Sequence, residues 1–269
     1  METGLRGKRA LVTGGASGIG RATVLALGAE GADVAIADLR PAPDVIAAVE
    51  ASGGRAHGIV ADVSDEDAVV RMVEAAFDAL GGLDLYVNNA GGAWHEAVTH
   101  VTRAGWERTI ATNVGASVFA CREVARRLIP GGGGAIVAVG STATVSAQPR
   151  ETSYRASKAA LKAHLEAAAI ELAPFGIRVN LVTPGATDTP FVAASDASQK
   201  ARVAAEIPLR RAARPEEIAI AIVFLLSDRL AGYITGTELI VDGGLRLRPI
   251  FHGSDTALRE LNDIVERKP

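Results

Sequence analysis

The sequence has 269 residues, of which 48% are hydrophobic and 22% are charged, with 28 basic and 31 acidic side chains. This composition excludes a globally disordered chain, and the net charge of −3 gives no overall attraction to nucleic acid or to an acidic membrane. The single cysteine, Cys121, excludes an internal disulfide and favours a reducing compartment.

The sequence shows no obvious secretion signal and no apolar run of membrane-spanning length. The first fifteen residues, METGLRGKRALVTGG, lack the long apolar stretch of a secretion signal. The longest apolar run, Ile218 to Leu226, is too short to span a bilayer. We therefore expect a cytoplasmic protein with no membrane partner and no nucleic-acid partner.

Short β-branched runs alternate along the chain with longer alanine-rich stretches of helical character. The predicted strands cover residues 9–13, 33–38, 56–62, 83–89, 135–141, 177–183 and 238–243. The predicted helices cover residues 18–30, 43–52, 65–80, 99–111, 113–129, 153–173 and 215–226. Strict alternation predicts an α/β fold with a doubly wound parallel sheet, flanked by helices. No Pro/Ser-rich linker interrupts it, so residues 1–245 are expected to form a single domain.

A glycine-rich turn, TGGASGIG, follows the first predicted strand over residues 13–20. Gly14, Gly18 and Gly20 allow a tight turn in which backbone N–H groups approach a pyrophosphate. Ser17 and Ile19 lie within this turn, at the start of the helix whose positive end would face the phosphates. The spacing G-x-x-x-G-x-G differs from the common dinucleotide fingerprint, but its position between the first strand and the first helix predicts nucleotide binding.

Asp38 ends the second predicted strand, 18 residues beyond Gly20. A carboxylate there can accept hydrogen bonds from a ribose 2′-OH and repel a 2′-phosphate. Arg40 is the opposing signal, since it could meet such a phosphate. Ser17 and Leu39 leave the nearest loop positions uncharged, so the sequence favours NAD over NADP.

Small, polar or glycine residues follow the later strands as well. The third strand ends at Asp62, the fourth runs into NNAG at 88–91, the fifth ends at Ser141, and the sixth runs into TPGATDT at 183–189. Ligands of open α/β sheets bind beyond the carboxyl ends of the strands. The polar strand ends therefore predict one ligand site along this edge of the sheet.

The stretch SYRASK, residues 153–158, sets Tyr154 and Lys158 four residues apart, on the same face of a predicted helix. In isolation such a pair is most simply a chance pair on a solvated face. A free tyrosine has a pKa of about 10, and an adjacent ammonium favours the phenolate that general base catalysis near neutral pH requires.

Taken in order, these motifs resemble those of the compact branch of the short-chain dehydrogenase/reductase family. The shared motifs are TGGASGIG, DV at 62–63, NNAG, Asn113, Ser141, YRASK at 154–158 and PGATDT at 184–189. Ser141 lies 13 residues before Tyr154, as in that family, and the resemblance covers about Leu5 to Leu245. It implies a Rossmann-type sheet of about seven strands. It also implies hydride transfer between NAD(H) and a secondary alcohol or ketone.

The resemblance also implies residue roles. Tyr154 would act as general acid/base, Lys158 would assist it and bind the nicotinamide ribose, Ser141 would hold the substrate oxygen, and Asn113 would anchor a water relay. The cofactor site it implies comprises Gly14, Ser17, Gly18, Ile19, Gly20, Asp38, Leu39, Asp62, Val63, Asn89, Ala90, Gly91, Tyr154, Lys158, Pro184, Gly185, Thr187 and Thr189. Two positions depart from the family pattern: Thr187 replaces an aliphatic residue and Thr144 replaces a glycine.

The substrate pocket leaves weaker signals. Trp94 and His95 follow the fourth strand and are candidates for its lining, against a simple surface loop. Arg150, between the serine and the tyrosine, is a candidate for meeting an acidic substrate. Residues 190–213 occupy the position of the family's substrate lid. The five histidines are scattered, so no catalytic metal is expected.

Assembly and alternative functions complete the expectations. The family packs the tyrosine helix between subunits, which predicts a homotetramer or homodimer. Residues 246–269 form a C-terminal extension, either a short amphipathic helix at a subunit interface or a frayed tail. The alternative functions are an NADP(H)-dependent ketone or 3-oxoacyl-type reductase, and a non-catalytic nucleotide-sensing protein. A sugar-nucleotide epimerase is disfavoured by its different glycine spacing.

Overall fold

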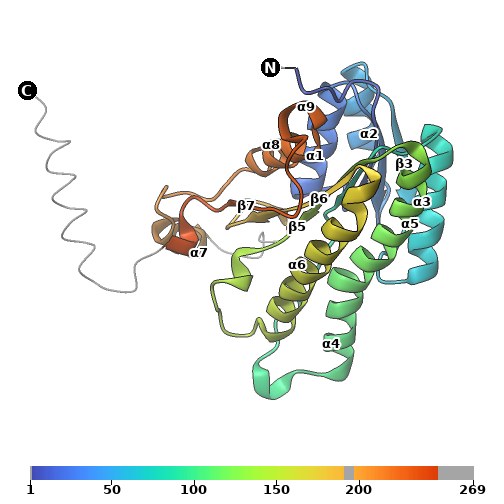
Figure 1. Ribbon diagram of the computed structural model, residues 1–269. Coiled ribbons are helices and arrows are strands. Elements are labelled where there is room, and N and C mark those ends of the chain that lie inside the picture. The colour runs from blue at the N-terminus through green and yellow to red at the C-terminus, as the bar shows by residue number, and fades with distance from the viewer. Residues whose placement is uncertain (1, 191–196, 248–269) are drawn as a thin grey trace, which may run out of the picture.

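One seven-stranded parallel sheet organises the chain in the computed structural model, which describes residues 2–190 and 197–247 (Figure 1). The strand order is β3-β2-β1-β4-β5-β6-β7. The strands are β1 Arg9–Thr13, β2 Asp33–Asp38, β3 Ala56–Val60, β4 Leu85–Asn88, β5 Gly134–Val139, β6 Ile177–Pro184 and β7 Glu238–Val241. The predicted Rossmann-type fold with seven strands is confirmed.

Helices cover both faces of the sheet, as Figure 1 shows. They are α1 Gly18–Ala29, α2 Pro43–Ala51, α3 Glu66–Leu80, α4 Arg103–Ile110, α5 Ala116–Gly131, α6 Thr152–Leu172, α7 Ala197–Glu206, α8 Pro215–Leu226 and α9 Asp228–Ala231. Successive strand residues point to opposite faces, so Leu11 packs with α3 and α5 while Val12 packs with α1 and α8. Two apolar cores result, one on each face, which explains strands that are apolar throughout.

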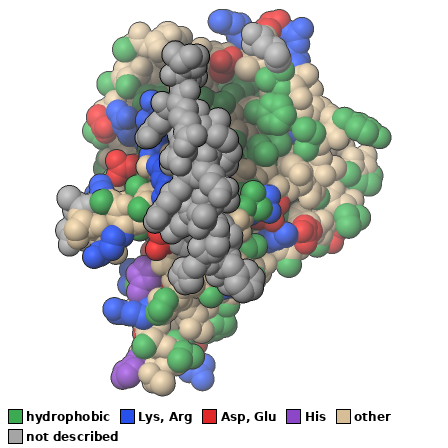
Figure 2. Space-filling view, turned by 90° about the vertical axis from the view of Figure 1, so that its left-hand side faces the viewer, with side chains coloured by type: hydrophobic (Ala, Val, Ile, Leu, Met, Phe, Trp, Pro, Cys, Tyr) green, Lys and Arg blue, Asp and Glu red, His purple; other side chains and the backbone are tan. Residues whose placement is uncertain are grey.

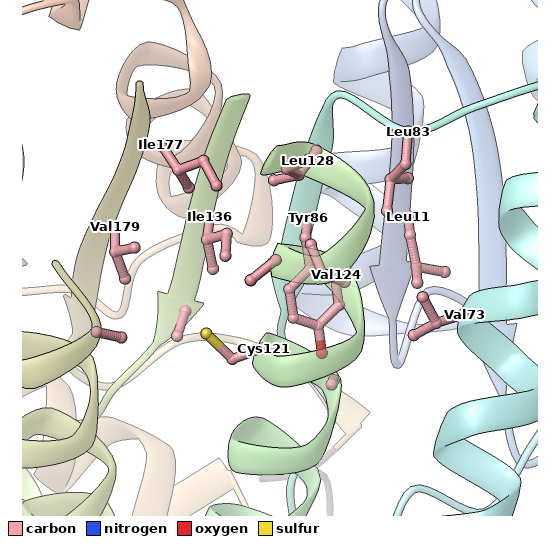
Figure 3. Close-up of a cluster of buried hydrophobic side chains, with 14 of the residues drawn as sticks. Leu11, Val73, Leu83, Tyr86, Cys121, Val124, Leu128, Ile136, Ile177 and Val179 are labelled. Atoms are coloured by element: carbon pink, nitrogen blue, oxygen red, sulfur yellow. The ribbon is translucent and has the colours of Figure 1, made fainter. Parts of the chain in front are cut away.

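The core beneath α3 and α5 contains the largest buried aromatic side chain, Tyr86 of β4. Figure 3 shows its ring among side chains of the central strands and of α5, including Ile136 and Val124. Cys121 of α5 is buried in the same cluster, and burial raises the pKa of its thiol to about 11. A buried thiol of that kind is a small hydrophobe and a poor nucleophile.

The strand order reverses between β1 and β4, which lie side by side in the middle of the sheet. At their amino ends, Arg9 donates from Nε and Nη2 to the Asp84 carboxylate at 2.7 and 2.9 Å. Their carboxyl ends open into the loops that carry the glycine turn and NNAG. Ligands of open α/β sheets bind at such a reversal point, so the topology directs attention to this edge.

Element boundaries differ from prediction mainly around Asn113. The sequence predicted helices over 99–111 and 113–129 with a break between them. Instead, α4 runs through a π-helical turn, Ala111–Gly115, directly into α5. The predicted strands at 56–62 and 135–141 end earlier, at Val60 and Val139, because the polar residues that follow them belong to turns. The predicted extension lies outside the described residues from position 248 onward, and part of the 190–213 segment lies outside them too.

Candidate active site

Thr13 and Asn89 join the loops at the carboxyl ends of the two central strands. The Thr13 hydroxyl accepts hydrogen bonds from the backbone N–H groups of Asn89 and Ala90 at 3.0 and 3.1 Å. The Asn89 amide donates in return to the carbonyls of Thr13 and Gly14 at 2.9 and 3.2 Å. This brace fixes the glycine turn against β4 at the point where the strand order reverses.

The glycine turn needs its glycines for conformation and for space. Gly14 and Gly18 have φ of +66° and +54°, in the left-handed region that side chains disfavour. A Cβ on Gly20 would lie 2.0 Å from the Gly14 carbonyl oxygen. Backbone atoms of the turn and of α1 therefore approach each other more closely than any other residue type allows.

The start of α1 is open to an anion. Its N-cap residue, Ser17, makes no side-chain capping bond, and its first turn holds no acidic residue. Ile19, in that first turn, is half-buried. The first N–H groups of a helix lack intrahelical partners and carry partial positive charge. This uncapped helix start behind a glycine turn fits the phosphates of a dinucleotide.

Asp38 ends β2 beside the glycine turn. Its carboxylate accepts hydrogen bonds from the backbone N–H groups of Ala16 at 3.1 Å and Arg40 at 3.2 Å. The next residue, Leu39, is 65% exposed. The two backbone bonds fix the carboxylate at the edge of the turn while the residue stays partly open to solvent. It is positioned to meet a hydroxyl group of a bound nucleotide.

Asp62 and Val63 form the turn after β3. The Asp62 carboxylate accepts hydrogen bonds from the Ser64 hydroxyl at 2.7 Å and backbone N–H at 2.9 Å, and these bonds lower its pKa. Asp62 itself is exposed, and Val63 packs partly against the core beneath α3 and α5. This turn thus presents a charged and an apolar group side by side at the same edge of the sheet.

Asn113 is buried in the π-helical turn between α4 and α5. It exchanges a pair of hydrogen bonds with the backbone of Gly92, at 2.9 and 2.8 Å, and donates to the Ser157 hydroxyl at 3.0 Å. A Cβ on Gly91 would lie 3.0 Å from Asn113 Oδ1 and 3.5 Å from Lys158 Nζ. Gly91 thus lies between these two polar side chains, at the end of the NNAG loop.

Ser141, Tyr154 and Lys158 come together at the end of β5 and the start of α6. The Tyr154 hydroxyl is hydrogen-bonded to Ser141. Lys158 is buried, donates from Nζ to the Val139 carbonyl at 3.0 Å, and lies 5.9 Å from the centroid of the Tyr154 ring. Ser141 also accepts a hydrogen bond from the Ala143 backbone at 3.1 Å, which fixes its side chain. The site therefore contains two hydrogen-bonded hydroxyl groups, those of Ser141 and Tyr154, and one buried ammonium group, that of Lys158.

Burial opposes the charged forms of both groups. It raises the pKa of Tyr154, whereas the hydrogen bond from Ser141 lowers it. Burial also lowers the pKa of Lys158 from its ordinary value to about 8. Lys158 forms no ion pair with a carboxylate in the described part of the chain. In the cofactor-free protein, desolvation is therefore the larger effect on Tyr154, and it raises the pKa of the phenol.

The segment after β6 closes the site on its other side. Gly185 directly follows Pro184, the last residue of β6. Its backbone N–H donates to the Val241 carbonyl at 3.0 Å. Thr187 is buried and donates to the Gly185 carbonyl at 3.1 Å. A Cβ on Gly18 would lie 3.2 Å from Thr189 Cγ2. The PGATDT segment therefore borders the glycine turn, although the two are more than 160 residues apart in sequence.

Trp94, His95 and Arg150 lie farther out. The Arg108 guanidinium lies 4.4 Å from the Trp94 ring centroid, and the two line a hollow between the loop after β4 and α4. Arg150 is exposed and donates to the His95 carbonyl at 3.1 Å. Trp94 thus contacts α4 and Arg150 contacts the backbone of His95, and none of the described contacts joins these three side chains to Ser141 or Tyr154.

Two polar residues at the site were not among the predicted ones. Thr13, which braces the two central loops, was quoted only as the first letter of the glycine motif. Its position at a strand end beside a glycine was the available signal. Glu151, three residues before Tyr154, forms a parallel bridge with Glu96, and pairing over 55 residues leaves no local signal.

Acidic and basic side chains are interspersed over the face seen in Figure 2. Across residues 2–190 and 197–247, no group of three or more His, Cys, Asp or Glu side chains is placed to hold a metal ion. Over the same ranges, no helix combines the length and apolar character needed to cross a membrane.

Comparison with known proteins assigns the chain to a family. A family model described as enoyl-(acyl carrier protein) reductase matches residues 14–246. A crystal structure of a short-chain type dehydrogenase/reductase from Mycobacterium marinum matches with a TM-score of 0.85 and 34% identity, over 91% of this chain and 97% of that one. The chain belongs to the short-chain dehydrogenase/reductase family.

Two curated members of this family are similar over nearly their whole length. Cis-4-hydroxycyclohexanecarboxylate dehydrogenase of Sinomonas cyclohexanicum is 42% identical over 237 residues, which cover 87% of this chain and 95% of that protein. 3beta-Hydroxysteroid dehydrogenase 1 of Eggerthella lenta is 36% identical over 260 residues, which cover 93% and 98%. The protein is thus an oxidoreductase that transfers hydride between a nicotinamide cofactor and an alcohol or ketone.

Proposed function

We propose that the protein is an NAD(H)-dependent secondary-alcohol dehydrogenase/ketone reductase in which Tyr154 is the general acid/base. The observation that carries this proposal is the group formed by Ser141, Tyr154 and Lys158. The Tyr154 hydroxyl meets Ser141, and Lys158 supplies a buried cation on the same helix face. A proton acceptor, a hydrogen-bonding hydroxyl and a positive charge are what alcohol oxidation requires.

The proposed cofactor site fits the described residues. The uncapped start of α1 and the turn of Gly14, Gly18 and Gly20 would hold the pyrophosphate. Asp62 and Val63 would meet the adenine, and the Thr187–Thr189 segment would border the nicotinamide. When bound, the nicotinamide accepts or gives up the hydride in this family's chemistry.

The chain's own residues would handle the proton. In oxidation, ionised Tyr154 takes the proton of the substrate hydroxyl, while Ser141 hydrogen-bonds the same oxygen and stabilises the charge that develops on it. Lys158 stabilises the phenolate. Asn113, which lies with Lys158 around Gly91, would anchor the route by which the proton reaches solvent. In reduction the same groups act in reverse, and Tyr154 donates the proton.

The preference for NAD over NADP rests on Asp38. Its carboxylate is fixed by two backbone N–H groups at the edge of the glycine turn. A ribose 2′-OH would donate to it, whereas a 2′-phosphate would meet a like charge. Arg40 is exposed next to it and is the feature that favours the opposite preference.

We also propose a cytoplasmic homo-oligomer, a tetramer or a dimer. The outer face of α6 supports this, because it exposes Ile170 to 78% amid the small residues Ala159, Ala160, Ala163 and Ala167. This face of small residues also exposes Glu166, which pairs with Lys162, and such a mixed face suits packing against another copy. Light scattering of the purified protein tests it, and a monomer at micromolar concentration would contradict it.

The test of the proposed activity is nicotinamide absorbance with a panel of secondary alcohols and NAD or NADP, together with the matching ketones and reduced cofactors. Ring alcohols come first, since both similar curated proteins are named for hydroxyl groups on rings. Tyr154→Phe serves as the paired variant and should bind NADH normally while losing at least about 1,000-fold in turnover. Near-normal turnover by that variant would overturn the mechanism. A protein that binds NADH but oxidises nothing would favour a nucleotide sensor.

A further inference from the structure

Glu151 stands one helical turn before Tyr154, at the N-cap of α6. Positions three apart lie on the same side of a helix, so its side chain is a neighbour of the tyrosine. Its charge acts on that tyrosine, since it helps to raise the pKa of Tyr154. Glu151 makes no capping bond to the helix, so the carboxylate is not engaged in the local role that such a residue often has.

The carboxylate of Glu151 is incompletely partnered. Its Oε2 atom is shielded from solvent and forms no hydrogen bond within the described residues. Burial raises the pKa of Glu151, and the basic groups that oppose this effect, His95 and Arg155, form no ion pair with it in the described part of the chain. Arg155 donates instead to the Thr144 carbonyl at 3.3 Å. Since shielded carboxylate oxygens are normally hydrogen-bonded, the vacant acceptor points to a donor supplied by a ligand.

The backbone around Glu151 is held in place from the opposite side of the site. Residue 151 forms a parallel bridge with Glu96, in the loop after β4. The preceding residue, Arg150, adopts a left-handed φ of +69° and donates to the His95 carbonyl. Such a conformation persists only where its surroundings hold it. The two segments thus form a fixed rim, defined here as residues 95–96 and 150–151, and Glu151 connects this rim to the start of the helix that carries Tyr154.

We propose that Glu151 is a specificity-determining residue that accepts a hydrogen bond from a second hydroxyl group of the substrate. The inference rests on the proposed function, because it assumes that the first hydroxyl is oxidised at Tyr154. An ionised carboxylate only accepts hydrogen bonds, and neutral hydroxyl groups are matching donors. It also repels an anionic substrate in a partly desolvated site. The preferred substrate class is therefore neutral vicinal diols and polyols on a ring, with hydroxy acids disfavoured.

Matched substrates and matched variants test this assignment. Cyclohexanol and cis-1,2-cyclohexanediol differ by one hydroxyl group, and cis-4-hydroxycyclohexanecarboxylate adds a negative charge. The value of kcat/KM is measured for all three with wild type, Glu151→Gln and Glu96→Gln. Glu96 is the matched control because it occupies the same rim and its Oε2 atom is likewise shielded without a hydrogen-bond partner among the described residues. Its carboxylate lies at the start of α4, where Oε1 accepts from the Thr102 hydroxyl at 2.9 Å and Oε2 lies beside Gly105. NADH binding by fluorescence monitors the integrity of the cofactor site.

For wild type, the expected diol/cyclohexanol ratio of kcat/KM is about tenfold or more, as for one hydrogen bond to a charged acceptor. Glu151→Gln should lower that ratio by about tenfold and raise the relative rate with the hydroxy acid, while Glu96→Gln keeps both ratios. Equal use of diol and cyclohexanol by wild type, or an unchanged ratio in Glu151→Gln, would overturn the role of Glu151 and leave the proposed activity standing. Failure of wild type to oxidise any alcohol would overturn the proposed activity, and this inference with it.

Discussion

Lys158 and Tyr154 lie on one face of α6, with the lysine Nζ atom 5.9 Å from the tyrosine ring centroid and hydrogen-bonded to the Val139 carbonyl. The ammonium is buried and has no carboxylate counter-ion within the described residues. A buried cation of this kind is a cost to folding that only a function would preserve.

Lys158→Met should therefore stabilise the protein and inactivate it. The pKa of Lys158 is about 8 in the folded protein and 10.5 in the unfolded chain, so keeping this side chain charged at pH 7 costs the folded state about 3 kcal/mol. The hydrogen bond to the Val139 carbonyl, which methionine cannot form, offsets about 1 kcal/mol of that cost. We expect a gain of about 2 kcal/mol in the free energy of unfolding.

The pH dependence of the stability gained by Lys158→Met shows whether the gain comes from the ammonium charge. Below pH 8 both states of the wild-type chain hold the Lys158 proton and the penalty is complete. Between pH 8 and 10.5 the unfolded state holds more protons than the folded state, so wild-type stability rises with pH and the advantage of methionine shrinks. Urea unfolding of both proteins at pH 7 and pH 10 measures this stability difference. If Lys158→Met were less stable than wild type at pH 7, the cost assigned to the buried ammonium would be contradicted.

Gly20→Ala should abolish cofactor binding and destabilise the fold. Its Cβ would lie 2.0 Å from the Gly14 carbonyl oxygen, so the glycine turn must move away from α1. Gly131→Ala is the matched control, since a Cβ there meets nothing within 4 Å in the last turn of α5, and it should be neutral or stabilising by about 0.5 kcal/mol. NADH fluorescence and thermal unfolding distinguish the two, and normal NADH affinity in Gly20→Ala would show that the turn does not hold the cofactor.

Asp38→Asn should reduce the preference for NAD by at least about tenfold, because it removes the charge that repels a 2′-phosphate while keeping the shape of the side chain. The Ala16 and Arg40 N–H groups donate to different oxygens of the carboxylate, so the amide oxygen can keep only one of the two bonds and the turn should lose about 1 kcal/mol. The ratio of kcat/KM for NAD and NADP is the measurement. A wild-type enzyme that prefers NADP would refute the role assigned to Asp38.

Asn113→Ala should cost about 3 kcal/mol, since it removes both bonds to the Gly92 backbone and the bond to Ser157 inside the protein. The loop after β4 should loosen beside Lys158, and turnover should fall with stability. Ser117→Ala, one turn away, is the control: the Ser117 hydroxyl is buried without a hydrogen-bond partner in the described chain, so its loss should be nearly neutral. Similar costs for both variants would contradict the role of the Asn113 network.

Glu151→Gln should shift the pH profile of alcohol oxidation. Burial and the Glu151 charge raise the pKa of Tyr154, the hydrogen bond with Ser141 lowers it, and the ammonium of Lys158 lies 5.9 Å from the ring centroid. Removing the Glu151 charge removes an influence that raises the pKa of Tyr154, so the phenolate forms at lower pH. The acidic limb of log kcat/KM should move to lower pH, and a shift to higher pH would contradict the electrostatic coupling.

The sequence predicted best those parts of the site that depend on residues close together along the chain. A glycine turn between the first strand and the first helix, a polar residue at each strand end, and a tyrosine and lysine four apart all depend on near neighbours. Their assembly along one edge follows from the parallel order of the strands. Strand-end position therefore indicated Asp38 and Ser141, and the resemblance to the family singled out Ser141 and Tyr154 as partners.

Other features depend on contacts that spacing does not encode. The Glu96–Glu151 bridge joins segments whose pairing is set by the packing of α4 and α6. The π-helical turn at Asn113 reads as ordinary helix, because one wide turn leaves the apolar pattern almost unchanged. The direction of the Tyr154 pKa depends on how completely the site is desolvated, which is a property of the folded chain.

The placement of β1 next to β4 also affects how the chain must be synthesised and folded. The middle of the sheet cannot close until residues 85–88 have left the ribosome, and β7, Glu238–Val241, pairs with β6 only after the long segment between them has been made. Because each strand pair joins residues far apart in sequence, folding should be slow, and nascent chains should expose unpaired apolar strands for seconds. Coexpressed chaperones and low temperature should therefore raise the soluble yield more than they raise the stability of the finished enzyme.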